Sequence, residues 1–110
     1  KRFGGLDLLH AALERVRACG MEPVLGDGLS SEIGCWMEAC VARTTIRNAG
    51  EFNGFLKPKA RLFAEPLMCE QAQLKLRRNF WPELDRAVLA AHEVARERFA
   101  PMSVSLGGAA

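Results

Sequence analysis

The sequence predicts an α/β fold, because a helical pattern, a short strand and a second helical pattern follow one another in its first half. From Leu6 to Cys19 apolar residues recur at helical spacing, and Gly20 supplies the stop that a helix needs. Residues 23–25 form a short apolar run, which is typical of a strand buried on both faces of a parallel sheet. A polar turn at 26–31 then leads into the second helix.

The second helix is the clearest predicted element. Ser30 or Ser31 stands where a helix cap is expected, and Glu32 suits the positive end of the helix dipole. Arg43 suits the negative end. Apolar residues repeat along it at helical spacing, and we expect them to form one core-facing stripe: Ile33, Trp36, Met37, Cys40 and Val41.

The pattern weakens from Thr44 to Pro66. The residues 44–46 favour a strand, so we expect a short strand near Ile46 or Phe52, followed by an irregular crossing segment. A further short strand is expected at residues 74–76, where apolar and polar residues alternate.

A third helix is predicted to begin at Pro82 and to end before Pro101. Its first turn is acidic, and its end carries Arg96 and Arg98, as the helix dipole favours. The residues 103–110 are small and glycine-rich, which predicts a frayed tail.

Composition excludes several functional classes. The 110 residues make at most one domain, and the formal net charge of +2 leaves no electrostatic footprint for nucleic acid or an anionic membrane. No apolar run approaches the ~20 residues of a membrane span, and no signal peptide follows Lys1. The chain does not begin with methionine, which indicates a piece of a longer protein. We expect a cytoplasmic location.

The four cysteines are expected to be reduced and mostly buried. Two of them fall within the second helix, none forms a C-x-x-C pair, and neither histidine lies at a zinc-like spacing from them. The sequence therefore predicts neither a disulfide framework nor a metal site within this chain. The residues concerned are Cys19, Cys35, Cys40, Cys69, His10 and His92.

Three stretches carry a resemblance to a known family. Phe-Gly-Gly-Leu at 3–6 precedes a helix that ends in Ala-Cys-Gly-Met at 18–21, and Pro-Val-Leu-Gly-Asp-Gly-Leu-Ser-Ser-Glu-Ile-Gly follows at 23–34. In order and spacing, residues 2–76 resemble the C-terminal part of the enolase superfamily, in its mandelate racemase and muconate-lactonizing branch. The family has similar turns after the sixth and seventh strands of its barrel.

The resemblance implies the C-terminal slice of a (β/α) TIM-like barrel at residues 1–76, followed by a C-terminal helix and tail at 77–110. Members remove a proton next to a carboxylate and stabilise the enediolate on Mg²⁺, because that proton is very weakly acidic. The metal ligands and the Lys-x-Lys base lie on earlier strands. The isolated chain is therefore expected to be inert, with no catalytic or metal-ligating residue of its own.

Positions that contact substrate carry over from the family motifs. Asp27 and Gly28 take the place of a Ser-Met pair after the seventh strand, and Ser30 stands where relatives carry glutamate. Near the eighth strand, Glu-Phe-Asn-Gly at 51–54 matches a pattern of Asp-Leu-Asp-Gly that contacts the distal end of the substrate. The expected substrate-binding residues are Asp27, Gly28, Ser30, Ser31, Glu51 and Asn53.

Each of these residues also has a purely structural interpretation. Serines and acids before a helix commonly cap it, and turns favour Asn and Glu without any function. For the departure at Ser30, Asp27 or Glu32 offers a substitute carboxylate. The family's second lysine base falls just upstream of Lys1, which stays an outside candidate.

Two hypotheses about function follow. In the first, the chain belongs to an enolase-superfamily racemase, epimerase, cycloisomerase or dehydratase that acts on a small carboxylate substrate. It then needs the missing N-terminal part of the same enzyme and forms a homo-oligomer when complete, without nucleic acid or membrane partners. In the alternative, the chain is a small self-contained helical module that binds a partner through its apolar stripes and has no catalytic activity.

Overall fold

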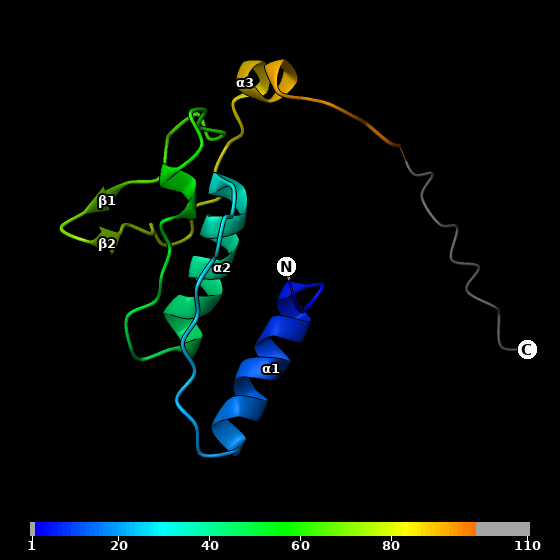
Figure 1. Cartoon of the computed structure of the whole chain (residues 1–110). Helices are drawn as coiled ribbons and strands as arrows, with labels where there is room; N and C mark the ends of the chain where they lie inside the picture. The colour runs from blue at the N-terminus through cyan, green and yellow to red at the C-terminus, as the bar shows by residue number, and fades with distance from the viewer. Residues whose placement is uncertain (1, 99–110) are drawn as a thin grey trace, which may run out of the picture.

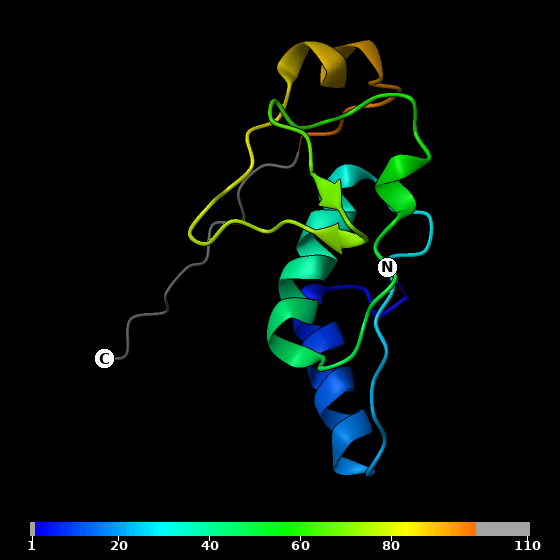
Figure 2. The ribbon, with the colours of Figure 1, turned by 90° about the vertical axis from the view of Figure 1, so that its left-hand side faces the viewer.

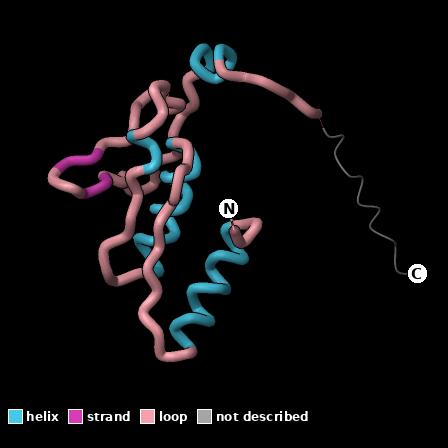
Figure 3. Tube along the Cα trace, viewed as in Figure 1, coloured by secondary structure: helices cyan, strands magenta, loops and turns pink. Residues whose placement is uncertain are grey.

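The computed structural model describes residues 2–98, which contain four helical segments and one small antiparallel sheet (Figure 1). Outside the two long helices most of the chain is loop (Figure 3). The elements are α1 (Leu6–Ala18), α2 (Glu32–Thr45), the 3-10 helix η1 (Gly54–Leu56), β1 (Cys69–Glu70), β2 (Gln73–Leu74) and α3 (Arg86–Ala91). A mixture of helix and a small sheet is therefore what this part of the chain forms, and no closed barrel occurs within residues 2–98.

The first predicted helix is confirmed as α1. It buries Leu9 and Leu13 against α2 and ends where Gly20 adopts a φ of +75°, a left-handed conformation that glycine reaches at no steric cost. The Met21 N–H then donates to the Val16 carbonyl at 3.2 Å, which satisfies one of the open carbonyls at the helix end.

The extended segment after α1 runs back along the helices, and Leu25 joins the core there. The residues of this core, which α1, α2 and the extended segment share, are Leu9, Leu13, Leu25, Val41 and Ala42. Val24 is 73% exposed, so the expectation that residues 23–25 are buried on both faces is wrong. Within the described residues, the helices cover one face of this segment and nothing covers the other.

A parallel bridge joins this segment to the chain that follows α2. Gly26 pairs with Glu51: the Asp27 N–H donates to the Glu51 carbonyl at 2.9 Å, and the Glu51 N–H donates to the Leu25 carbonyl at 3.1 Å. Both segments run in the same direction beside the helices (Figure 2). The strands expected at 23–25 and near Ile46 or Phe52 are thus reduced to one bridge, with α2 as the crossover between parallel partners.

The buried face of α2 differs from the predicted stripe. Ile33, Trp36, Met37 and Cys40 are only partly buried, and of the stripe Val41 alone lies fully inside. Small residues face the core instead, because α2 packs closely against both α1 and η1. The buried residues of α2 are Glu32, Cys35, Ala39, Val41, Ala42 and Thr45.

The ends of α2 have local causes. Ser31, rather than Ser30, caps the helix by accepting a hydrogen bond from the Gly34 N–H at 3.3 Å. Thr44 and Thr45 are helical, contrary to their predicted preference for a strand. Both hydroxyls donate to the Val41 carbonyl, at 3.1 and 2.7 Å, so their hydrogen bonds are satisfied inside the helix.

The crossing segment meets the C-terminal part through an antiparallel bridge between Phe63 and Leu84. A hairpin of two short strands, β1 and β2, projects from the crossing segment on the side of α2 away from α1 (Figure 1). The strand predicted at 74–76 is found at residues 73–74, because Gln71 and Ala72 make a tight turn with φ of +51° and +60°.

Helix α3 is much shorter than predicted. It begins at Arg86, because Asp85 caps it by accepting hydrogen bonds from the Ala87 and Val88 N–H groups, each at 3.0 Å. Pro82 lies before it, next to the bridge at Leu84, and the helix already ends at Ala91. The tail at 103–110 lies outside the described residues.

All four cysteines are free thiols. Cys35 is buried and Cys40 partly buried, whereas Cys19 and Cys69 are exposed, so the expectation of mostly buried thiols fails for two of the four. Within residues 2–98 no helix has the length and apolar character that crossing a membrane requires.

Candidate functional site

A cleft of about 720 Å³ lies where the two parallel segments end. Its walls come from the N-terminal turn, from the segment around Gly26 with the loop that follows, and from one side of α2. The lining residues are 2–6, Leu9, 25–30, Gly34, Met37, Glu38 and Glu51. Polar groups and an apolar wall therefore meet at the carboxyl ends of parallel strands, the usual position of a ligand site in α/β folds.

Four of the six predicted site residues line this cleft: Asp27, Gly28, Ser30 and Glu51. The other two do not. Ser31 serves as the helix cap, which was its structural interpretation, and Asn53 donates from Nδ2 to the Glu51 Oε1 at 3.4 Å. Asn53 thus contacts a lining residue rather than the cleft.

The Asp27 carboxylate is held by the neighbouring loop. Asp27 is only 3% exposed, and its two carboxylate oxygens accept the Gly54 N–H at 3.1 and 3.3 Å. A buried carboxylate needs such donors, because loss of water is costly for a charged group. Asp27 therefore joins the two loops that follow the parallel segments.

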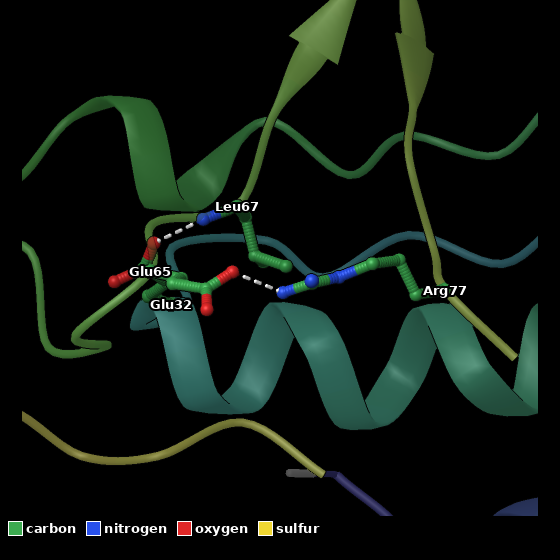
Figure 4. Close-up of polar contacts among 4 residues, drawn as sticks. All are labelled: Glu32, Glu65, Leu67 and Arg77. Carbon is green, nitrogen blue, oxygen red and sulfur yellow. Dashed lines mark hydrogen bonds and ion pairs between the residues drawn. The ribbon is translucent and has the colours of Figure 1, made fainter. Parts of the chain in front are cut away.

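Glu32 does not replace the carboxylate that relatives carry at Ser30. It is 2% exposed, and its oxygens accept three backbone N–H groups of the crossing segment: Leu62 at 2.7 Å, Phe63 at 3.0 Å and Leu67 at 2.7 Å. Figure 4 shows the bond to Leu67 beside an ion pair between Glu65 and Arg77. Glu32 therefore has a structural role, and it is not among the residues that line the cleft.

Cys35 lies beneath the site and was missed by sequence reasoning. Its thiol donates to the Phe52 carbonyl at 3.7 Å. Burial raises the pKa of this thiol, and the hydrogen bond with Asp27 and the negative charges of Asp27, Glu38 and Glu32 raise it further. The raised pKa favours the protonated thiol, which acts here as a hydrogen-bond donor to Phe52.

The remaining wall was also not predicted. Phe3, Leu6, Leu29 and Met37 give it apolar surface, and Arg2 and Glu38 add charge. Their positions along the sequence carry no pattern that marks a site, because they come from an N-terminal turn, a loop and a helix that only the fold brings together.

The carboxylates around the cleft do not form a metal site. Within residues 2–98 no group of three His, Cys, Asp or Glu side chains is placed to hold a metal ion, and both Asp27 oxygens already accept the Gly54 N–H. The residues 2–98 thus supply no complete metal site of their own, and the Mg²⁺ ligands that the family resemblance implies were expected outside this chain.

Comparison of the chain with family models, with curated proteins and with solved structures found no match. The geometry of the cleft is therefore the basis on which a function is proposed.

Proposed function

We propose that this chain is the C-terminal part of a Mg²⁺-dependent enzyme of the enolase superfamily, which removes a proton α to a carboxylate. Racemisation, epimerisation, cycloisomerisation and dehydration are the reactions that begin in this way. The observation that carries the proposal is the position of the cleft, which lies at the carboxyl ends of two parallel segments joined by α2.

The uncovered face of the parallel pair supports the same proposal. Parallel sheets occur almost only where both faces are covered, yet Val24 on the open face is 73% exposed. A barrel supplies the missing layer, since its other strands and the side chains between them fill that space. The proposal assigns those strands to chain outside the described residues.

In this proposal the chain binds substrate and does not carry out the chemistry. The apolar wall formed by Phe3, Leu6 and Leu29 excludes water from the substrate body, and Glu51 accepts hydrogen bonds from its distal polar groups. A bound Mg²⁺ would supply stabilisation of negative charge on the substrate carboxylate, and residues outside this chain would provide its ligands and the bases.

The test measures exchange of the substrate α-proton, and it uses the protein as encoded, which means the full-length product of the gene. Incubation in D₂O with a panel of carboxylates and Mg²⁺ is expected to replace the α-proton by deuterium, as followed by ¹H NMR, and EDTA is expected to stop the exchange. Glu51→Gln should lower kcat/KM, whereas Glu14→Gln, an exposed carboxylate on α1, should not. Absence of exchange for every carboxylate, together with an upstream coding sequence that lacks Lys-x-Lys and three spaced acids, contradicts the proposal.

A helical module that binds a protein partner is the second candidate, and the exposure of Trp81 (83%) favours it. The two candidates differ in how the 110-residue chain unfolds by itself. A sharp, cooperative melt of a monomer supports the module. A broad transition that sharpens when the upstream part is present supports the barrel slice, whose uncovered faces need that part.

A further inference from the structure

Asp27 is tied to the loop 51–54 through both its backbone and its side chain. Its N–H donates to the Glu51 carbonyl at 2.9 Å, while its carboxylate accepts the Gly54 N–H at 3.1 and 3.3 Å. Asp27 therefore holds the loop at both ends, as a backbone donor to Glu51 and as a buried carboxylate acceptor for Gly54, and this fixes the path of the loop.

The fit at Gly54 leaves no room for another path. A Cβ added there would lie 2.7 Å from the Gly28 carbonyl oxygen, 2.7 Å from the Ser30 nitrogen and 2.9 Å from the Asp27 Oδ2. The loop therefore crosses directly over the turn at 27–30, a contact that only glycine allows. The Cys35 thiol holds the intervening Phe52 carbonyl from below, at 3.7 Å.

Glu51 is the group of this loop that faces the cleft. It is exposed and lines the cleft, and its Oε1 accepts a hydrogen bond from Asn53 at 3.4 Å. Its direction depends on the loop, because the parallel bridge holds the Glu51 backbone and Cys35 holds the carbonyl of the next residue, Phe52.

We propose that Asp27 is a positioning residue: its buried carboxylate fixes the loop 51–54 and so directs Glu51 into the cleft, where Glu51, and not Asp27, contacts the substrate. The part that concerns substrate rests on the proposed function. The part that concerns the loop does not.

The experiment compares Asp27→Ala, Asp27→Asn and Glu51→Gln in the protein as encoded, with Glu14→Ala as a control. Hydrogen–deuterium exchange of the peptide 51–56 reports the loop, and α-proton exchange of a carboxylate reports the site. We expect Asp27→Ala to raise amide exchange in this peptide about tenfold, the effect of losing one charge-assisted hydrogen bond. The same variant should lower turnover.

Asp27→Asn is expected to rescue both readouts, because the asparagine Oδ1 still accepts the Gly54 N–H. Glu51→Gln should lower turnover while the loop stays protected. Unchanged amide exchange in Asp27→Ala overturns the proposal. So does an Asp27→Asn variant that protects the loop yet turns over as slowly as Asp27→Ala, because the charge of Asp27 itself then contacts substrate.

Two further outcomes are covered. If the alanine variant does not fold, Gly54→Ala replaces it: the added Cβ should displace the loop and raise amide exchange, and unchanged exchange overturns the proposal. If the parent protein exchanges no α-proton, the proposed function fails, and amide exchange in the peptide 51–56 alone then supports or overturns the positioning role of Asp27.

Discussion

At the scale of single residues, Glu32 is a buried acid that accepts several hydrogen bonds from the backbone. It begins α2, where the helix dipole favours a negative charge, and it is almost wholly buried. Its two oxygens accept three backbone N–H groups of the segment 62–67. The carboxylate thus joins the start of a helix to a loop 30 to 35 residues further along the chain.

Glu32→Gln is expected to destabilise the fold by about 2 kcal/mol, because an amide offers one accepting oxygen, whereas one buried and two partly buried N–H donors share the two oxygens of the carboxylate. The matched control is Glu65→Gln in the same segment. Glu65 pairs with Arg77 at the surface, where such pairs contribute less than about 1 kcal/mol. Urea unfolding followed by circular dichroism measures both, and equal losses would contradict the role given to Glu32.

Cys35 predicts a pH dependence of stability. Its thiol pKa is raised from an ordinary value of 9.0, mainly by burial, so above pH 9 the unfolded chain loses a proton that the folded chain keeps. Stability from this group is therefore complete below pH 9 and falls as pH rises.

Between pH 7 and pH 10 we expect the parent to lose roughly 1.4 kcal/mol more unfolding free energy than Cys35→Ala, which has no thiol at this position. Urea unfolding at the two pH values gives the comparison. Equal pH dependence of parent and variant would show that the thiol titrates as freely in the folded chain as in the unfolded one.

At the scale of elements, α2 packs through its small residues and not through its large ones. Cys35, Ala39 and Ala42 face the core, while Trp36 lies at the edge of the helix. There it makes edge-to-face contacts with Phe63, at 6.4 Å between ring centroids, and with Trp81, at 5.1 Å. The large side chain fastens the crossing segment onto the helix and does not fill the core.

Trp36→Ala is accordingly expected to cost about 2 kcal/mol, less than the 3–5 kcal/mol of a fully buried aromatic residue. Phe55→Ala is the matched comparison, because Phe55 is 1% exposed and packs in η1 against α2. Thermal unfolding of both variants tests the difference. If Trp36→Ala costs as much as Phe55→Ala, Trp36 belongs to the core after all.

The existence of the two helices in the first half could be predicted from local sequence alone. The stripe of α1 and the stop at Gly20 lie within a few residues of each other, so the sequence predicts their outcome. Which face of α2 is buried depends on how closely α1 and η1 approach, and periodicity does not contain that distance. The predicted length of α3 was wrong for a related reason, since the residues 82–85 contribute to the bridge with the crossing segment and not to the helix.

The candidate site divides in the same way. Asp27, Gly28, Ser30 and Glu51 follow strand-like segments, and the rule that loops at the carboxyl ends of strands gather predicts their meeting. Cys35 and Glu32 have partners 17 to 35 residues away, and Phe3 and Met37 come from other elements. Nothing in their local sequence distinguishes them from ordinary core or cap residues.

At the scale of the whole molecule, large apolar side chains remain at the surface on two sides. Val24 lies on the open face of the parallel pair, and Trp81 stands beside Trp36 near the bridge at Leu84. Valine and tryptophan side chains are largely buried on average in folded proteins. Under the proposed function, we expect the rest of the enzyme to cover both surfaces.

Fluorescence quenching tests this expectation. In a Trp36→Phe background Trp81 is the remaining tryptophan of this chain. Acrylamide should quench it strongly in the isolated chain and several-fold less in the protein as encoded, whose other tryptophans are replaced by phenylalanine. Equal quenching in the two forms would mean that Trp81 stays exposed, and the partner-binding module would then be the better explanation.

The hydrogen bonds of Glu32 also set an order of events during synthesis. The last N–H group that the Glu32 carboxylate accepts belongs to Leu67, 35 residues downstream. Glu32 therefore leaves the ribosome well before all of its hydrogen-bond donors have been synthesised. A nascent chain that ends between residues 46 and 61 contains the whole of α2 but none of these donors. In such a chain water takes the place of these donors at Glu32, and the hydrogen bonds that join α2 to residues 62–67 form only after the crossing segment has emerged.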